Sequence, residues 1–153
     1  MNALIGVARA APAAASARAL AAGPICRIDI VRDLSQAATI WDSLDACGAL
    51  RTPYQRYDWV CLWQRHVGAH NAVEPLLVVG RGVDGAPLFL WPLGIQAVGP
   101  FSVARFLGGK HTNFNLGLWR RDLAASITAA ELRGVLERIR LSSSVVPKAS
   151  ALT

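Results

Sequence analysis

The segment 74–96 constrains the fold of this chain more than any other part of its sequence. It reads EPLLVVGRGVDGAPLFLWPLGIQ, in which two apolar runs, 75–79 and 88–93, flank a joint rich in glycine, aspartate and proline. Two apolar runs of strand length with a turn signal between them predict a β-hairpin. Asp84 and Gly85 supply the turn, because glycine accepts the positive φ that tight turns need. Neither run alternates between apolar and polar residues, so we expect both faces to be covered in mid-sheet.

Helical periodicity precedes this hairpin twice. Ser35 is placed to cap a first helix, whose apolar face includes Trp41 and Cys47, and Gly48 is placed to end it. A second helix is expected over 57–67, with Gly68 at its end. The spacing of the tryptophans in these helices and in the hairpin favours core packing over stacking on a ligand.

A third helix has the clearest start signal. Thr128 and Glu131 match a capping box, in which the hydroxyl and the carboxylate each satisfy a free backbone N–H. The apolar face that follows is expected to contain four residues. They are Leu132, Val135, Leu136 and Ile139.

Short strands complete the pattern. Residues 26–32 alternate and carry one polar face, which indicates a strand near a sheet edge. Residues 101–107 form a second alternating strand, with Phe101, Val103 and Arg105 on one side, and 114–119 are read as a further strand or extended loop. This order of elements predicts an α+β layered domain with a mostly antiparallel sheet flanked by helices.

The expected domain covers residues 25–141 and lies between two tails. Residues 1–24 are rich in alanine and contain no acid, and we favour a flexible tail there over a transit or secretion leader. After residue 141 the periodic pattern is lost, so 142–153 is expected to be an irregular tail.

Charge and hydropathy exclude several classes of protein. The chain is 53% hydrophobic and 17% charged, which argues against wholesale disorder. It has no apolar stretch near the ~20 residues of a membrane span. Its net charge is +6, but the arginines are dispersed and no nucleic-acid-binding motif accompanies them. Three cysteines without metal-ligand spacing favour reduced thiols and a cytoplasmic location.

Polar residues gather after the strand 101–107. Gly108, Gly109 and Lys110 can present backbone N–H groups and a positive charge to an anion, although a plain strand-end turn is the commoner use of two glycines. The polar residues from His111 to Asn115 can line a substrate cleft or form a surface loop. His66 and His70 have the spacing of metal ligands on one helix face, but no third ligand is near, and no metal site is predicted.

Six segments in order carry a family resemblance. The sequence resembles the bacterial cellulose-biosynthesis (CelD-type) acetyltransferase-like proteins of the GNAT superfamily, over approximately residues 28–140. The segments are 40–44 (IWDSL), 51–55 (RTPYQ), 59–63 (WVCLW), 75–79 (PLLVV), 90–93 (LWPL) and 105–109 (RFLGG).

The resemblance implies a GNAT-like fold and transfer of an acyl group from acetyl-CoA or another acyl-CoA to an amine acceptor. The superfamily holds the coenzyme pyrophosphate at an Arg/Gln-x-x-Gly-x-Gly/Ala turn that opens a helix. The nearest match here consists of Arg105, Gly108, Gly109 and Lys110, with Lys110 in the position of a small residue. We therefore expect a truncated N-terminal module that binds no coenzyme alone and pairs with a missing C-terminal module.

Candidate site residues follow from position and polarity. No residue matches a catalytic motif of the family, and His111 is the candidate general base if the chain acts alone. A non-catalytic protein-interaction module is the alternative function. The acceptor-binding candidates are Tyr54, Gln55, His111, Asn113 and Asn115.

Overall fold

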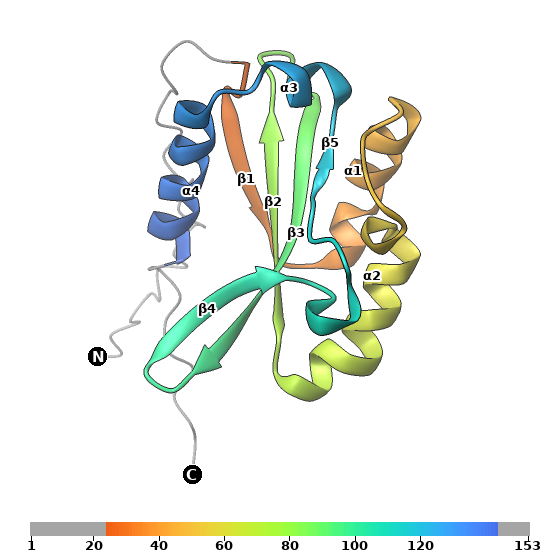
Figure 1. Cartoon of the computed structure of the whole chain (residues 1–153), viewed down its shortest axis with the longest axis vertical. Coiled ribbons are helices and arrows are strands. Elements are labelled where there is room, and N and C mark those ends of the chain that lie inside the picture. The colour runs from red at the N-terminus through yellow and green to blue at the C-terminus, as the bar shows by residue number, and fades with distance from the viewer. Residues whose placement is uncertain (1–23, 144–153) are drawn as a thin grey trace, which may run out of the picture.

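The computed structural model describes residues 24–143 of the 153-residue chain (Figure 1). It is an α+β domain with an antiparallel sheet and helices on both faces, as predicted. The predicted tails 1–24 and 142–153 fall almost entirely outside the described residues. The elements are β1 (Arg27–Val31), α1 (Leu34–Ala46), α2 (Tyr57–Trp63), β2 (Glu74–Arg81), β3 (Pro87–Val98), β4 (Phe101–Phe106), β5 (Leu118–Trp119), α3 (Arg121–Ser126) and α4 (Ala129–Ser143).

The predicted hairpin is confirmed as the centre of the sheet. β2 and β3 pair antiparallel, with Leu77 opposite Pro92. Gly85 has a φ of 78°, and the backbone N–H of Ala86 donates to Oδ1 of Asp84 at 3.0 Å. The side chain of Asp84 therefore replaces a backbone acceptor in the turn, which explains why the Asp-Gly pair marks it.

The outer edge of β3 is shared by two strands. The sheet order is β1-β2-β3-β4, and β5 pairs with β3 as well. β5 lies opposite Phe89 and Leu90, whereas β4 pairs with the later part of β3, from Leu93 to Val98. β4 therefore diverges from β5, as Figure 1 shows. β1 pairs only with β2 among the described strands, which confirms the edge position predicted for it.

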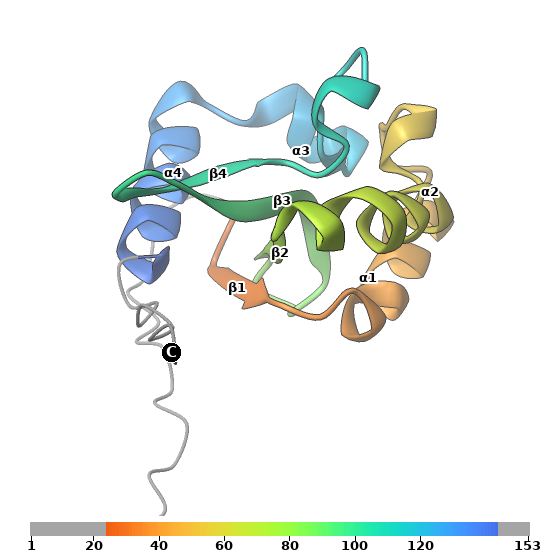
Figure 2. The ribbon, with the colours of Figure 1, turned by 90° about the horizontal axis from the view of Figure 1, so that it is seen from below.

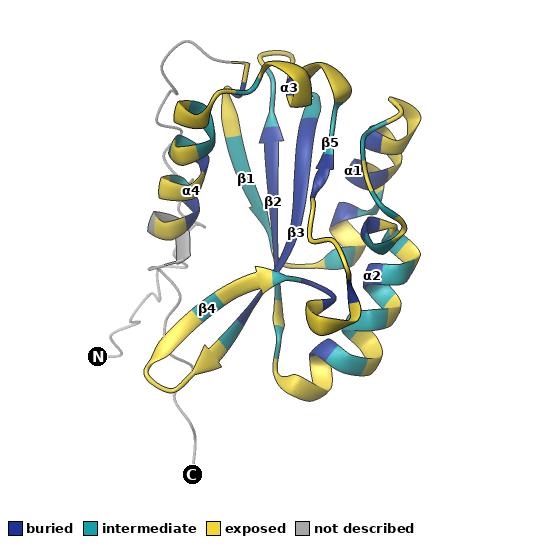
Figure 3. Cartoon of the chain, in the orientation of Figure 1, coloured by how far each residue is buried: buried dark blue, intermediate teal, exposed yellow. Residues whose placement is uncertain are grey.

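Each face of the sheet has its own core. Leu77 and Val79 of β2 point to the side of α1 and α2, and Leu76 and Val78 point to the side of α3 and α4. Figure 2 shows α1 and α4 on opposite sides of the sheet, and Figure 3 shows that β2 and most of β3 are buried between them. Burial on both faces explains the uninterrupted apolar runs of the hairpin.

The predicted cap of α1 is wrong by two residues. The N-cap is Asp33, whose Oδ1 accepts hydrogen bonds from the backbone N–H and the hydroxyl of Ser35, both at 2.8 Å. Trp41 is fully buried, as predicted, but Cys47 is exposed at the C-cap and does not belong to the apolar face. Gly48 follows with a φ of 64° and ends the helix as predicted.

The predicted end of α2 at Gly68 is also wrong. The helix continues into a wider turn, Gln64–Gly68, and a 3₁₀ turn, Ala69–Asn71. Gly68 keeps right-handed helical angles, and its role is to leave space, because a Cβ there would lie 2.2 Å from Oε1 of Gln64. That Gln64 side chain folds back and donates from Nε2 to the carbonyl of Val73 at 2.7 Å.

The C-terminal part was predicted only in outline. Within 114–119 only Leu118–Trp119 is strand, and the short helix α3 was not predicted. The capping box of α4 is confirmed, since Thr128 and Glu131 exchange hydrogen bonds of 2.7 to 3.2 Å. The predicted apolar face is wrong at Leu136, which is 53% exposed.

Candidate functional site

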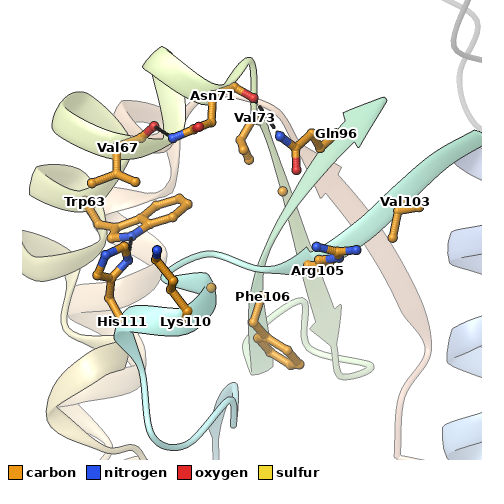
Figure 4. Close-up of a pocket in the computed structure, with 12 residues that line it drawn as sticks. Trp63, Val67, Asn71, Val73, Gln96, Val103, Arg105, Phe106, Lys110 and His111 are labelled. Atoms are coloured by element: carbon orange, nitrogen blue, oxygen red, sulfur yellow. Dashed lines mark hydrogen bonds between the residues drawn. The ribbon is translucent and has the colours of Figure 1, made fainter. Parts of the chain in front are cut away.

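A cleft opens between the C-terminal end of α2 and the diverging strand β4. Its volume is about 310 Å³ (Figure 4). Its walls come from the turns that follow α2, from the second half of β3, from β4 and from the turn after β4. The lining residues are Trp63, Val67, Asn71, Val73, Gly94, Gln96, Val103, Arg105, Phe106, Gly109, Lys110 and His111.

Strand register places Arg105 in this cleft. Arg105 lies opposite Gly94, and Val103 lies opposite Gln96, so these four positions share one face of the β3–β4 pair. That face is the one covered by α1 and α2 elsewhere in the sheet. A Cβ at Gly94 would lie 2.4 Å from Cγ1 of Val73, so glycine is required for the close approach that forms the floor of the cleft.

The turn after β4 carries Lys110 and His111 to the cleft. Gly108 and Gly109 have φ values of 110° and 49°, and the backbone N–H of His111 donates to the carbonyl of Gly108 at 2.9 Å. A Cβ at Gly108 would lie 2.9 Å from the ring of Trp59. The two glycines are therefore needed for backbone conformation, and at Gly108 also for packing.

A hydrogen bond links Trp63 to His111. Nε1–H of Trp63 donates to Nδ1 of His111 at 3.2 Å, across 48 residues of sequence. An indole nitrogen only donates, so Nδ1 must be unprotonated in this arrangement. The proton of the neutral imidazole then lies on Nε2, which makes His111 a hydrogen-bond donor at its other nitrogen.

Gln96 contributes an acceptor on the opposite side of the cleft. Its Nε2 donates to the backbone carbonyl of Asn71 at 2.8 Å. Because a carbonyl oxygen can only accept, this contact fixes the orientation of the amide. Figure 4 shows the remaining oxygen, Oε1, turned toward the interior of the cleft. Asn71 is held in turn by donating from Nδ2 to the carbonyl of Val67 at 2.7 Å.

The charge in the cleft is positive. Arg105 and Lys110 are exposed and form no ion pair with any residue from 24 to 143. No lining residue carries a carboxylate. The arrangement therefore offers Lys110 and His111 on the wall near Trp63, and Arg105 together with the amide oxygen of Gln96 on the wall formed by the sheet.

The structure brings together four of the nine predicted site residues. The cleft is lined by Arg105, Gly109, Lys110 and His111. Gly108 does not line it but packs closely against Trp59 and Thr112 beside it.

The other four predicted residues lie outside the cleft. Gln55 is 3% exposed, and its side chain links two distant segments of the chain. Its Oε1 accepts hydrogen bonds from Thr52, and its Nε2 donates to the carbonyl of Phe114 at 3.0 Å. Tyr54 packs edge-on against Trp59. Asn115 accepts from the hydroxyl of Thr112, and Asn113 is exposed.

Eight of the twelve lining residues are not among the predicted site residues, and Trp63 and Gln96 matter most for the chemistry of the cleft. The spacing of the tryptophans predicts core packing for Trp63, and Gln96 lies beyond the second apolar run, at the end of the segment 74–96. A signal existed for Gln96, which is the only polar side chain in the second apolar run and its extension to Val98. No local signal pointed to Trp63, because its partner is distant in sequence.

The described part of the chain, residues 24–143, offers neither a metal cluster nor a membrane-spanning helix. No group of three or more possible metal ligands occurs there, and His66 and His70 are both exposed. None of its helices is long and apolar enough to cross a membrane.

Comparison with protein-family models, curated proteins and solved structures found no match for this chain.

Proposed function

We propose that this domain is the acceptor-binding module of an acyl-CoA-dependent N-acyltransferase. The observation that carries the proposal is the orientation of Gln96, whose Oε1 faces the cleft because its Nε2 is engaged by Asn71. An amine is a hydrogen-bond donor, and this amide oxygen is placed to accept from it. The resemblance to acetyltransferase-like proteins supplies the reaction class, and one of its motifs, 105–109, ends in the cleft.

The size of the cleft supports an acceptor in preference to a coenzyme. A volume of about 310 Å³ is at the lower end of the roughly 300–1,000 Å³ range of small-ligand pockets. A small amine is a better match for that volume than an entire coenzyme A molecule. Acyl-CoA is then bound by another part of the enzyme, as the resemblance implies.

The hydrogen bond from Trp63 changes the role of His111. With Nδ1 accepting from the indole, the free nitrogen Nε2 already carries a proton and is not available as a general base. We therefore assign to His111 a binding role in the cleft. The base that deprotonates the attacking amine is then supplied from outside the lining residues.

Calorimetric titration of the full chain tests this function. The probes are glucosamine, glucosamine 6-phosphate, L-glutamate and acetyl-CoA, each compared between the wild type and Gln96→Leu. We expect saturable binding of at least one amine that Gln96→Leu weakens about tenfold, since the side-chain acceptor for the amine is lost. Failure of every amine to bind, or micromolar binding of acetyl-CoA that Arg105→Ala abolishes, would contradict the acceptor assignment.

A protein-interaction module is the second candidate, and the tip of the β3–β4 hairpin favours it. Phe101 is 70% exposed and Val98 is 45% exposed, and β4 pairs only with β3 among the described strands. An open strand edge binds an extended strand through main-chain hydrogen bonds. Sedimentation velocity tests this candidate, which predicts concentration-dependent self-association that Phe101→Ser reduces. A chain that stays monomeric at all concentrations contradicts self-pairing at this edge.

A further inference from the structure

We propose that the cleft recognises an anionic oxygen group on its ligand, a phosphate or a carboxylate, through Arg105, Lys110 and Nε2–H of His111. The location of this site rests on the proposed function, because the same ligand would occupy the cleft. The amine contact and the anion contact use different groups. Gln96 accepts a hydrogen bond from the amine, and the nitrogen atoms of Arg105, Lys110 and His111 bind the anion.

No ion pair of the described chain involves a charged residue of the cleft, and the same is true of several other exposed arginines, such as Arg65 and Arg133. Each ion pair in the described chain joins an arginine to an aspartate. Examples are Arg81 with Asp29 and Arg51 with Asp45, both at 2.6 Å. Five such ion pairs form in the described chain, and none includes a residue of the cleft. Arg105 and Lys110 therefore keep their charge free for a ligand.

The cleft also holds these charges close to a wall of apolar groups. Val67, Val73 and Val103 line it beside the ring of Trp63. An anion at the centre would accept from the guanidinium of Arg105 in the paired geometry that carboxylates and phosphates share.

Trp63 makes His111 part of the same donor set. Its indole N–H occupies Nδ1 at 3.2 Å, so the neutral ring presents Nε2–H. A neutral imidazole in the opposite tautomer would present a lone pair and repel an anion. Trp63 is thus a positioning residue, because it acts on the ligand through His111.

Gln96 lies apart from Lys110 and His111 in the cleft, whereas Arg105 lies on the same face of the sheet as Gln96. In Figure 4, Gln96 and Asn71 lie at one end of the view, and Lys110 and His111 lie at the other, with Arg105 beside the strand. A ligand that makes both contacts carries an amine and an anionic group on one small molecule. Amino acids and amino-sugar phosphates have this chemistry.

The test compares anion binding in matched variants of the full chain. Inorganic phosphate, glucosamine and glucosamine 6-phosphate are titrated calorimetrically at constant ionic strength. Arg105→Ala is compared with Arg133→Ala, which removes the same charge from an exposed position on α4, across the sheet from the cleft. Lys110→Ala serves as a second cleft variant. We expect Arg105→Ala and Lys110→Ala each to weaken phosphate binding about tenfold, as for a charged hydrogen bond, and Arg133→Ala to leave it unchanged.

The outcomes separate the two proposals. Absence of phosphate binding in the wild type, or equal weakening by Arg105→Ala and Arg133→Ala, would overturn the anion site. If phosphate binds as expected but glucosamine 6-phosphate binds no more tightly than phosphate, the anion site stands and the amine-binding function fails. If glucosamine and its 6-phosphate bind equally, the amine site stands and the anion site is wrong. Titration with L-glutamate in place of glucosamine 6-phosphate shows whether the anion site binds a carboxylate or a phosphate more tightly.

The role of Trp63 has a spectroscopic test that does not depend on activity. Ring ¹⁵N shifts report which nitrogen of each histidine carries the proton, and the exposed His66 and His70 provide references within the same molecule. We expect His111 to show the Nε2–H form in the wild type and a mixture in Trp63→Phe, with phosphate binding weakened by roughly threefold for one neutral hydrogen bond. An unchanged His111 pattern in Trp63→Phe would contradict the positioning role.

Discussion

At the scale of single residues, glycines decide where backbone and side chains approach each other. Gly48 and Gly108 both have positive φ, yet their surroundings differ. A Cβ at Gly48 would meet nothing within 4 Å, whereas one at Gly108 would lie 2.4 Å from Cγ2 of Thr112 and 2.9 Å from the ring of Trp59. The first position needs glycine for its dihedral angles alone, and the second needs it for packing as well.

This difference predicts unequal costs for the same substitution. Gly48→Ala should lower the free energy of unfolding by about 1 kcal/mol, because a left-handed conformation is strained in alanine. Gly108→Ala should lower it by about 3 kcal/mol, since overpacking adds to that strain. Urea denaturation of the two variants measures both values. Equal costs would show that the contact between the Gly108 turn and Trp59 is looser than described.

At the scale of elements, the caps show how α1 and α4 begin. The carboxylate of Asp33 caps α1, and the sequence pattern had pointed to Ser35. Asp33→Ala should therefore cost about 1 kcal/mol of stability, and Ser35→Ala should cost much less, because the serine is not the N-cap. Chemical denaturation of both variants measures the two losses of stability. A larger loss in Ser35→Ala would indicate that Ser35 is the N-cap, as the sequence pattern predicted.

The capping box of α4 adds a dependence on pH. Hydrogen bonds from the backbone N–H and the hydroxyl of Thr128 lower the pKa of Glu131 from its ordinary value of 4.5. A carboxylate whose pKa is lower in the folded state stabilises the fold above its unfolded pKa, and that contribution is lost as the pH falls through the folded pKa. The stability difference between wild type and Glu131→Gln should be present at pH 7 and shrink in acid. A difference independent of pH from 7 to 3 would contradict this account.

The sequence predicts elements well where one local pattern decides them. The hairpin was predictable because two uninterrupted apolar runs flank an Asp-Gly turn. The end of α2 was not, because Gly68 makes room for the folded-back side chain of Gln64 and does not end the helix. A third of the lining residues was predictable, because Arg105, Gly109, Lys110 and His111 lie within seven residues of one another. Trp63 was not, since it joins the cleft through a contact across 48 residues.

At the scale of the whole molecule, one sheet separates two apolar cores. Adjacent residues of β2 serve different cores, because Leu76 packs toward α4 and Leu77 packs toward α1. Both are fully buried. The cores therefore depend on the same strands, and the loss of either should unfold the whole domain.

This arrangement predicts a single cooperative transition. Leu76→Ala and Leu77→Ala should each lower the free energy of unfolding by about 3 kcal/mol, through lost burial and a residual cavity. Far-ultraviolet circular dichroism and tryptophan fluorescence should give coincident transitions in both variants. Separate transitions would mean that the two layers of helices unfold independently.

The central claim is that a ligand with an amine and an anionic group binds in the cleft beside β4. Two-dimensional ¹H–¹⁵N spectra of the full chain, recorded while glucosamine 6-phosphate is added, test this claim most directly. We predict saturable shifts concentrated at Gln96, Arg105, Lys110 and His111 and at the indole N–H of Trp63. Shifts that gather on α4, or that remain small and uniform along the described chain, would contradict the claim.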